Sequence, residues 1–285
     1  MINLKSFLTK HPVLSVISLA ISWLVLIMIF AGIATSLLNK EFGDPIILFI
    51  GHLAGILYVF IILWRLGWLE GAGITQFGTD QIWLVAIVGT VYFALASLYS
   101  FYGKPAFDFS DPSNLSSSGG LIIMQAVVCI DEEMLFRGAI LYILVRSRGN
   151  TQKGIFRSVI LMSAIFALFH IIWFISSGIS LATVFLLAEA IIISIWWAAM
   201  VLKGGSIWPA FLAHFVVNTV VALKGISGII IQPDLEVYIK LLLFSLPLGI
   251  FGFWLTTRSF DHKSDKEIKW QISNSPKERP CSLLR

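Results

Sequence analysis

The sequence predicts an all-α, polytopic membrane protein with about eight transmembrane helices. Hydrophobic residues make up 58% of the 285 residues and charged residues only 13%, and the mean hydropathy is +0.89. Soluble domains carry about 25% charged residues, so this composition excludes an ordinary soluble fold. The apolar residues are grouped in runs of about 19–26, the length that a helix needs to cross roughly 30 Å of hydrocarbon.

Each expected span is an apolar run bounded by polar or glycine-rich residues. The first run follows two lysines but is too long for the apolar core of a signal peptide, so we expect it to be retained. In chain order, the expected spans are Val13–Leu38, Pro45–Trp64, Ile82–Tyr102, Leu121–Leu144, Ile155–Ile175, Leu181–Leu202, Ser206–Leu223 and Tyr238–Thr257.

The segments outside the spans have distinct compositions. Residues 65–81 are glycine-rich with scattered apolar side chains, which indicates a position at the membrane interface. Residues 104–120 are rich in Pro, Asp, Ser and Gly, and are expected to form a loop. We therefore expect a single transmembrane domain over residues 1–258, with a motif-bearing core at 121–223, and a polar cytoplasmic tail over 259–285.

Basic residues are distributed unevenly between the two sides of the predicted bundle. If the N-terminus is cytoplasmic, most of the 20 Lys and Arg residues lie in cytoplasmic segments, chiefly the connection 146–157 and the tail. This bias predicts an integral, multi-pass protein of the plasma membrane with both termini in the cytoplasm. It also accounts for the net charge of +4 without a nucleic-acid partner, whereas the lipid bilayer is an expected partner.

Polar residues deep inside three apolar runs carry the functional prediction, because such residues are expensive in lipid. At 1.5 Å per residue, Glu132, His170, His214 and Asn218 lie roughly 16–22 Å from the cytoplasmic ends of their spans. Polar residues without a shared role would scatter in depth. We therefore expect these four side chains to meet at one site within the membrane.

The residue types at this depth suit hydrolysis of a peptide bond by water. Glu132 would act as the general base, assisted by His170. His214 and Asn218 share one helix face and would donate hydrogen bonds to the developing oxyanion. No Ser or Cys occupies an evident nucleophile motif, which disfavours an acyl-enzyme.

Other polar residues of the spans are assigned supporting or structural roles. Glu133 and Arg137 are spaced i, i+4 and are expected to form an ion pair that leaves Glu132 free for chemistry. Glu189 reaches the same depth and is a candidate for tuning the site or contacting substrate. His52 is interpreted as structural, and Asp131 as a local polar neighbour of the site.

The tryptophans are expected to lie at the membrane interface rather than in the site. The pair Trp196–Trp197 and the single Trp208 are interpreted as anchors at the membrane interface. The two cysteines, Cys129 and Cys281, offer neither a disulfide framework nor zinc-ligand spacing.

Three motifs occur in order on three of the spans: Glu132-Glu133-x-x-x-Arg137, Phe166-x-x-x-His170 and His214-x-x-x-Asn218. The last is preceded by Gly205-Ser206-Ile207-Trp208-Pro209-Ala210. Over roughly Leu121 to Asn218, this pattern resembles the CAAX protease and bacteriocin-processing (CPBP) family of intramembrane proteases. The resemblance implies a glutamate-dependent endopeptidase of eight helices that opens toward the cytoplasm. It also implies a catalytic set of Glu132, His170, His214 and Asn218, supported by Glu133 and Arg137.

Three alternatives to a glutamic-type protease stay open. The resembled family includes members implicated in immunity or scaffolding, so a non-catalytic role is one alternative. Carboxylates and two histidines could bind zinc, although the H-E-x-x-H motif is absent; no cofactor and no metal ligand is assigned. An acid–imidazole relay would also serve a proton-coupled transporter, although no internal repeat is evident.

The expected substrate is a peptide or protein, lipidated or embedded in the membrane. A prenylated protein terminus, a peptide pheromone or bacteriocin leader, and a membrane-protein segment all fit the residues of the site equally well.

Overall fold

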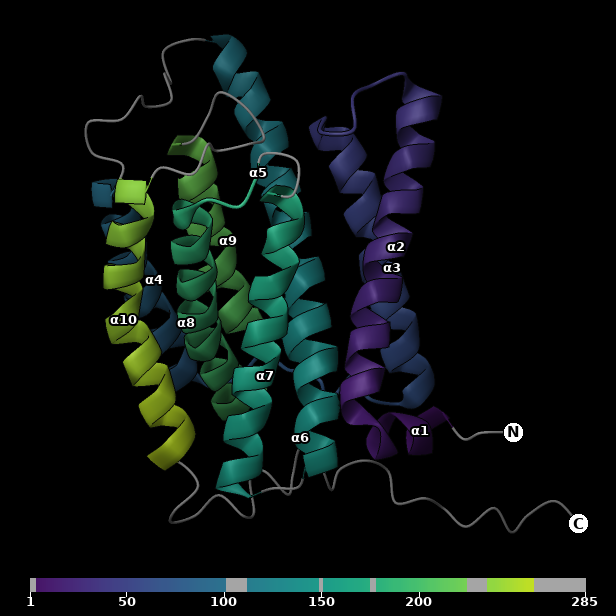
Figure 1. Ribbon diagram of the computed structural model, residues 1–285, viewed down its shortest axis with the longest axis vertical. Coiled ribbons are helices and arrows are strands. Elements are labelled where there is room, and N and C mark those ends of the chain that lie inside the picture. The colour runs from purple at the N-terminus through teal and green to yellow at the C-terminus, as the bar shows by residue number, and fades with distance from the viewer. Residues whose placement is uncertain (1–3, 101–111, 149–150, 175–177, 225–234, 259–285) are drawn as a thin grey trace, which may run out of the picture.

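The computed structural model describes residues 4–100, 112–148, 151–174, 178–224 and 235–258, and over these residues the chain is helical apart from short connections (Figure 1). No strand occurs within these ranges, so the all-α prediction is confirmed. The α-helices are α1 (Leu4–Lys10), α2 (Pro12–Leu38), α3 (Pro45–Leu66), α4 (Asp80–Ser100), α5 (Pro112–Glu133), α6 (Tyr142–Arg148), α7 (Gln152–His170), α8 (Leu181–Gly204), α9 (Trp208–Lys224) and α10 (Leu235–Arg258).

The lengths of these helices confirm a multi-pass membrane protein. Within the described ranges, six helices are long and apolar enough to cross a membrane: α2, α3, α4, α7, α8 and α10. The apolar α9 is shorter, at 17 residues. The remaining predicted span is continuous from α5 to α6 and contains the π-helix η1 (Met134–Leu141). Every predicted span therefore corresponds to a helical segment.

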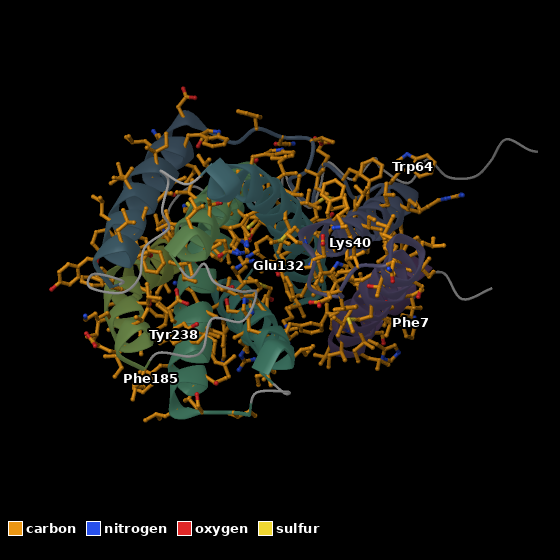
Figure 2. The ribbon with its side chains drawn as sticks, turned by 90° about the horizontal axis from the view of Figure 1, so that it is seen from above. Phe7, Lys40, Trp64, Glu132, Phe185 and Tyr238 are labelled. Atoms are coloured by element: carbon orange, nitrogen blue, oxygen red, sulfur yellow. The ribbon has the colours of Figure 1, made fainter. Side chains whose placement is uncertain are left out.

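The long helices stand side by side, with α2 and α3 forming a hairpin at one side of the bundle (Figure 1). Helix α1 and the last turn of α10 lie at the same end of the bundle as the end of α6 and the start of α7. Seen along the bundle, Glu132 lies near the centre, whereas Trp64 and Phe185 lie at the periphery (Figure 2). Large apolar side chains are exposed along α2 and α4, as expected for helices in contact with lipid.

Local sequence signals fix the ends of the helices that carry the site. The Thr151 side chain accepts a hydrogen bond from the Gly154 N–H at 3.1 Å and caps the start of α7. Ser180 and Thr183 form a reciprocal capping box at the start of α8. The same helix ends at Gly204 and is capped by Gly205, whose φ of 64° is left-handed and therefore favours glycine.

Two predicted boundaries are wrong. Residues 112–120 were expected in a loop but form the first turns of α5. Proline suits a first helical turn because its missing N–H would have no intrahelical partner there, so Pro112 starts a helix rather than breaking one. The fifth span ends at His170 and continues only as a 3₁₀ turn over Ile171–Phe174. The rest of the predicted loop and the polar tail lie outside the described residues.

The glycine-rich segment between α3 and α4 is tied to the start of α9. The N–H of Ile207 donates to the Gly73 carbonyl at 3.1 Å, and the Ser206 hydroxyl donates to the Gln76 carbonyl at 2.6 Å. Gly73 has a φ of 72°, and a Cβ there would lie 2.9 Å from Ser206 Cα. Trp68 of this segment is buried in the core. The segment thus braces the helix that carries His214 and Asn218.

Candidate active site

Three consecutive carboxyl residues, Asp131, Glu132 and Glu133, end α5 in the middle of the bundle. Successive residues of a helix point about 100° apart, so the three side chains face different neighbours. Asp131 and Glu133 are fully buried, and the Glu132 side chain is 15% exposed. Carboxyl groups at such positions need partners, because their ionised forms are expensive away from water.

Glu133 forms the predicted ion pair with Arg137. The Arg137 Nη1 donates to Glu133 Oε1 at 2.9 Å, and Nη2 donates to Ser194 Oγ at 2.8 Å. The guanidinium also lies over the rings of Phe166 and Trp197, 4.4 and 5.1 Å from their centroids. Arg137 is therefore held by groups from α5, α7 and α8, and it neutralises Glu133.

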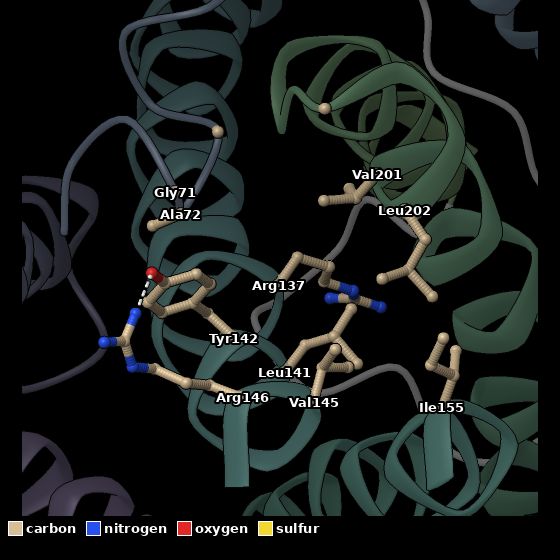
Figure 3. A pocket seen from close by; sticks show the side chains of 12 residues that line it. Gly71, Ala72, Arg137, Leu141, Tyr142, Val145, Arg146, Ile155, Val201 and Leu202 are labelled. Atoms are coloured by element: carbon tan, nitrogen blue, oxygen red, sulfur yellow. Dashed lines mark hydrogen bonds between the residues drawn. The ribbon is translucent and has the colours of Figure 1, made fainter. Parts of the chain in front are cut away.

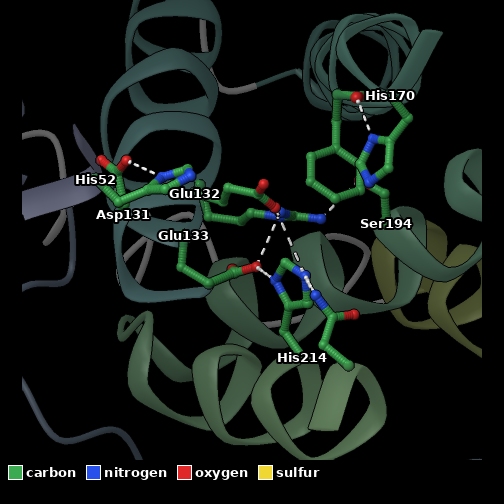
Figure 4. Close-up of polar contacts among 10 residues, drawn as sticks. His52, Asp131, Glu132, Glu133, His170, Ser194 and His214 are labelled. Carbon is green, nitrogen blue, oxygen red and sulfur yellow. Dashed lines mark hydrogen bonds and ion pairs between the residues drawn. The ribbon is translucent and has the colours of Figure 1, made fainter. Parts of the chain in front are cut away.

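His214 is oriented by the same carboxylate. Its Nδ1 lies 2.9 Å from Glu133 Oε1. An ionised carboxylate can only accept, so Nδ1 carries the hydrogen, and Nε2 is directed to the other side of the ring. That Nε2 lies 3.1 Å from Asn218 Nδ2 and 3.6 Å from Glu132 Oε2. The imidazole stacks on Trp197 with 4.3 Å between ring centroids, which fixes its plane (Figure 4).

The buried Oε2 of Glu132 has no hydrogen-bond partner among the described residues, and the same holds for Oε2 of Glu133. Glu132 differs because Glu133 is held through its other oxygen, Oε1, by Arg137 and His214. The 3.6 Å to His214 Nε2 is too long for a hydrogen bond. A buried acceptor of this kind needs a donor, and water is the smallest donor that fits. Glu132, His214 and Asn218 are therefore brought together around one polar position, as predicted.

His170 is attached to the site through an aromatic ring. Its Nδ1 lies 3.0 Å from the Phe166 carbonyl, so this nitrogen donates and Nε2 remains an acceptor. The Phe166 ring lies 4.7 Å from the His170 ring and 5.9 Å from that of His214, centroid to centroid. Within the described residues, no hydrogen bond or ion pair joins His170 to Glu132.

Glu189 is not brought into this cluster. It lies on α8, partly buried, and forms no hydrogen bond or ion pair with the described part of the chain. No group of three or more His, Cys, Asp or Glu side chains in that part is arranged to hold a metal ion.

The sequence interpretation missed two contributors on α8. Trp197 was assigned to the membrane interface, but it is 2% exposed and stacks on His214. That assignment is wrong because the ring packs between a guanidinium and an imidazole, both good partners for an aromatic face. Trp196, assigned in the same way, is fully buried. Ser194, which holds Arg137, had no sequence signal beyond being a small polar residue in a span.

A small cavity lies between the site and the end of the bundle where α6 meets α7 (Figure 3). Its volume is about 30 Å³, room for one or two water molecules. Arg137 lines it on the side of the site, and Tyr142, Arg146 and the stretch 71–73 line it toward the end of the bundle. The cavity thus reaches the Arg137 side chain of the Glu133–Arg137 pair.

Comparison with known proteins identifies the part of the chain that carries these groups. Residues 114–220 match the family model described as Type II CAAX prenyl endopeptidase Rce1-like. Neither the curated proteins nor the solved structures contain a match to the chain. The matched stretch runs from α5 into α9 and includes all three motifs, so the resemblance drawn from the motifs is confirmed. In its motif-bearing core, the chain is similar to the Rce1-like type II CAAX prenyl endopeptidases.

Proposed function

We propose that this protein is an intramembrane endopeptidase in which Glu132 activates water to hydrolyse a peptide bond. The observation that carries the proposal is the buried Oε2 of Glu132, which has no hydrogen-bond partner among the described residues and lies 3.6 Å from His214 Nε2. A carboxylate oxygen with a free lone pair beside an oriented imidazole is what general-base catalysis requires.

Glu132 takes one proton from water as the water oxygen bonds to the peptide carbonyl carbon. It returns that proton to the amide nitrogen as the carbon–nitrogen bond breaks, which leaves a carboxyl group and an amine. His170 assists by accepting a hydrogen bond from the same water through Nε2, because its Nδ1 is occupied by the Phe166 carbonyl.

Asn218 and His214 stabilise the oxyanion. The Asn218 Nδ2 has hydrogens to donate in any state of the site. His214 Nε2 donates only when the ring is an imidazolium, because its other nitrogen already donates to Glu133. The Glu133 carboxylate at 2.9 Å orients that donor.

We propose a peptide or protein substrate that presents its cleaved bond within the membrane. The family name favours a prenylated protein terminus. The position of Glu132 near the centre of an apolar bundle supports a lipidated or membrane-embedded substrate over a soluble one.

We further propose that the site opens to the cytoplasm and that both termini lie on that side of the plasma membrane. The cavity extends from Arg137 toward the end of α6 and the start of α7, and the stretch 146–157 is rich in basic residues. Helix α1 and the last turn of α10 lie at that same end.

Comparative proteomics of peptide termini tests the activity in cells. We expect a set of new termini in cells with the wild-type protein that disappears with Glu132→Ala at equal protein level. Identical termini in both cell lines would reject the protease and favour a non-catalytic scaffold or immunity protein. A chelator added to the purified enzyme separates the two water-activation routes, because only the zinc-dependent alternative loses activity and regains it with zinc.

A further inference from the structure

The cavity between the site and the end of the bundle is lined by three polar side chains, and all three can donate hydrogen bonds. They are Arg137, Tyr142 and Arg146, and Figure 3 shows them among aliphatic side chains. Within the described part of the chain, no Asp or Glu side chain lines this cavity. Two guanidinium groups beside one small space, without an acidic neighbour there, favour a ligand that accepts hydrogen bonds and carries negative charge.

Arg137 brings an unused donor to the cavity. Its Nη1 and Nη2 donate to Glu133 and Ser194 at 2.9 and 2.8 Å. Its Nε is buried and has no hydrogen-bond partner among the described residues, and the residue as a whole is 1% exposed. Buried donors are almost always paired, with protein, water or a ligand. The Nε therefore requires an acceptor that the described chain does not supply.

Tyr142 and Arg146 form the side of the cavity that is further from the site. The Arg146 Nη1 donates to the Tyr142 hydroxyl oxygen at 3.0 Å, and the guanidinium carbon lies 5.4 Å from the centroid of the Trp68 ring. Because the hydroxyl oxygen accepts from Arg146, its own hydrogen remains to be donated to a third group. At Gly71, a Cβ would lie 2.6 Å from that oxygen, so the glycine makes room for the phenol. These contacts fix the Arg146 guanidinium beside the cavity.

The charge of Arg146 has no acidic partner among the described residues. Its contacts there are the Tyr142 hydroxyl and two aromatic rings. The nearby buried carboxylates are engaged elsewhere. That of Asp131 is bound by His52 Nδ1 at 2.8 Å and by Trp23 Nε1 at 2.9 Å (Figure 4). An anion in the cavity supplies the negative charge that the protein does not place there.

The size and position of the cavity define the anion. A volume of about 30 Å³ accommodates about two water-sized atoms, which matches two oxygens of an oxyanion. Guanidinium groups bind phosphate oxygens through parallel N–H···O bonds. Arg146 lies in the last turn of α6, at the end of the bundle. Phosphate-bearing lipid headgroups surround the ends of membrane-spanning helices.

We propose that the cavity is an oxyanion-binding site, in which Arg137 Nε, Arg146 and the Tyr142 hydroxyl bind two oxygens of a phosphate group. The phosphate belongs to a lipid headgroup or is free phosphate. Its binding leaves Arg137 Nη1 on Glu133, so the ligand ties the end of α6 to the residue that holds the catalytic carboxylates together. This inference does not rest on the proposed endopeptidase activity.

Thermal unfolding of the purified protein in a neutral detergent tests the binding. The probes are inorganic phosphate, dioctanoyl phosphatidic acid and dioctanoylglycerol, which has the same acyl chains without the phosphate; sodium chloride keeps the ionic strength constant. At a concentration 100-fold above the dissociation constant, a ligand stabilises by about 2.7 kcal/mol, so we expect the unfolding temperature to rise by roughly 5–10 °C. A rise with inorganic phosphate identifies free phosphate as a ligand, whereas a rise with phosphatidic acid alone identifies the lipid headgroup.

Three variants locate the binding site. We expect Arg146→Gln to raise the dissociation constant about 10–100-fold, because it removes a charged donor, and Tyr142→Phe to raise it about 3–10-fold. Arg148→Gln is the matched control, since it removes the same charge from the same helix and does not line the cavity; it should respond as the wild type does. Each variant is compared with its own unfolding temperature without ligand, which separates binding from lost stability.

Three results would overturn the inference. No rise with either phosphate-bearing probe would show that the cavity holds water only. An equal rise with dioctanoylglycerol would show that acyl chains, and not an oxyanion, stabilise the protein. An equal loss of binding in Arg148→Gln and Arg146→Gln would show a general attraction of anions to the basic end of the bundle.

Discussion

Replacing Arg137 by methionine tests how the site is held together. Arg137 is 1% exposed and donates to Glu133 and Ser194 at 2.9 and 2.8 Å. Removal of one partner from a buried ion pair costs about 3–5 kcal/mol, because the remaining charge is left uncompensated. Methionine fills much of the same volume, so this loss dominates over any cavity. At about 2–4 °C per kcal/mol, we expect the unfolding temperature to fall by roughly 6–20 °C.

A double-mutant cycle measured by thermal unfolding in detergent isolates the ion pair. Arg137→Met, Glu133→Gln and the double variant are compared with the wild type. We expect the double variant to lose about 1–3 kcal/mol less than the sum of the single changes, since no uncompensated charge remains. Arg65→Met, an exposed cation at the end of α3, is the matched control and should change stability by less than about 0.5 kcal/mol. Strictly additive losses would refute the account of Glu133 and Arg137 as a mutually dependent pair.

Three further predictions concern packing, orientation and pH. Gly55→Ala should destabilise the protein by about 1–3 kcal/mol in thermal unfolding, because its Cβ would meet Asp131 within 2.7 Å; unchanged stability contradicts the close approach. Trp197→Leu should lower kcat roughly 10–100-fold through a misplaced His214, and wild-type kcat contradicts that role. The Lys40 ammonium and the Ile46 N–H hold the pKa of Asp44 below its usual range, so this cap stabilises the protein above roughly pH 4 and is lost on acidification. Asp44→Asn, which keeps the cap, should flatten that part of the stability profile, and an unchanged profile contradicts this assignment.

Hydropathy was sufficient to predict the helices, because a membrane span must satisfy its backbone internally and present apolar side chains to lipid. Depth along each span was sufficient to predict that Glu132, His214 and Asn218 meet, because the membrane places comparable distances along different spans at one level. The i, i+4 spacing predicted the pair of Glu133 and Arg137, because both residues lie on one helix and their contact is local.

Contacts between helices could not be predicted in the same way. A span that is apolar all round carries no periodic signal for the face that packs inward. The pairing of His52 with Asp131 depends on α3 lying against α5, and the place of Trp197 depends on α8 facing α9. Both contacts are decided by tertiary packing, which composition alone does not predict. The π-helix η1 is likewise invisible in the sequence pattern, although π-helical turns frequently accompany functional sites.

The most direct test of the central claim compares Glu132→Gln with Glu189→Gln in purified, membrane-reconstituted protein. Both changes remove a carboxylate from the interior of a span, and both replacements preserve side-chain shape. With an internally quenched prenylated peptide, the account predicts that Glu132→Gln lowers kcat by about 10²–10⁴-fold while Glu189→Gln cleaves at the wild-type rate. Cleavage at the wild-type rate by folded Glu132→Gln would contradict the account.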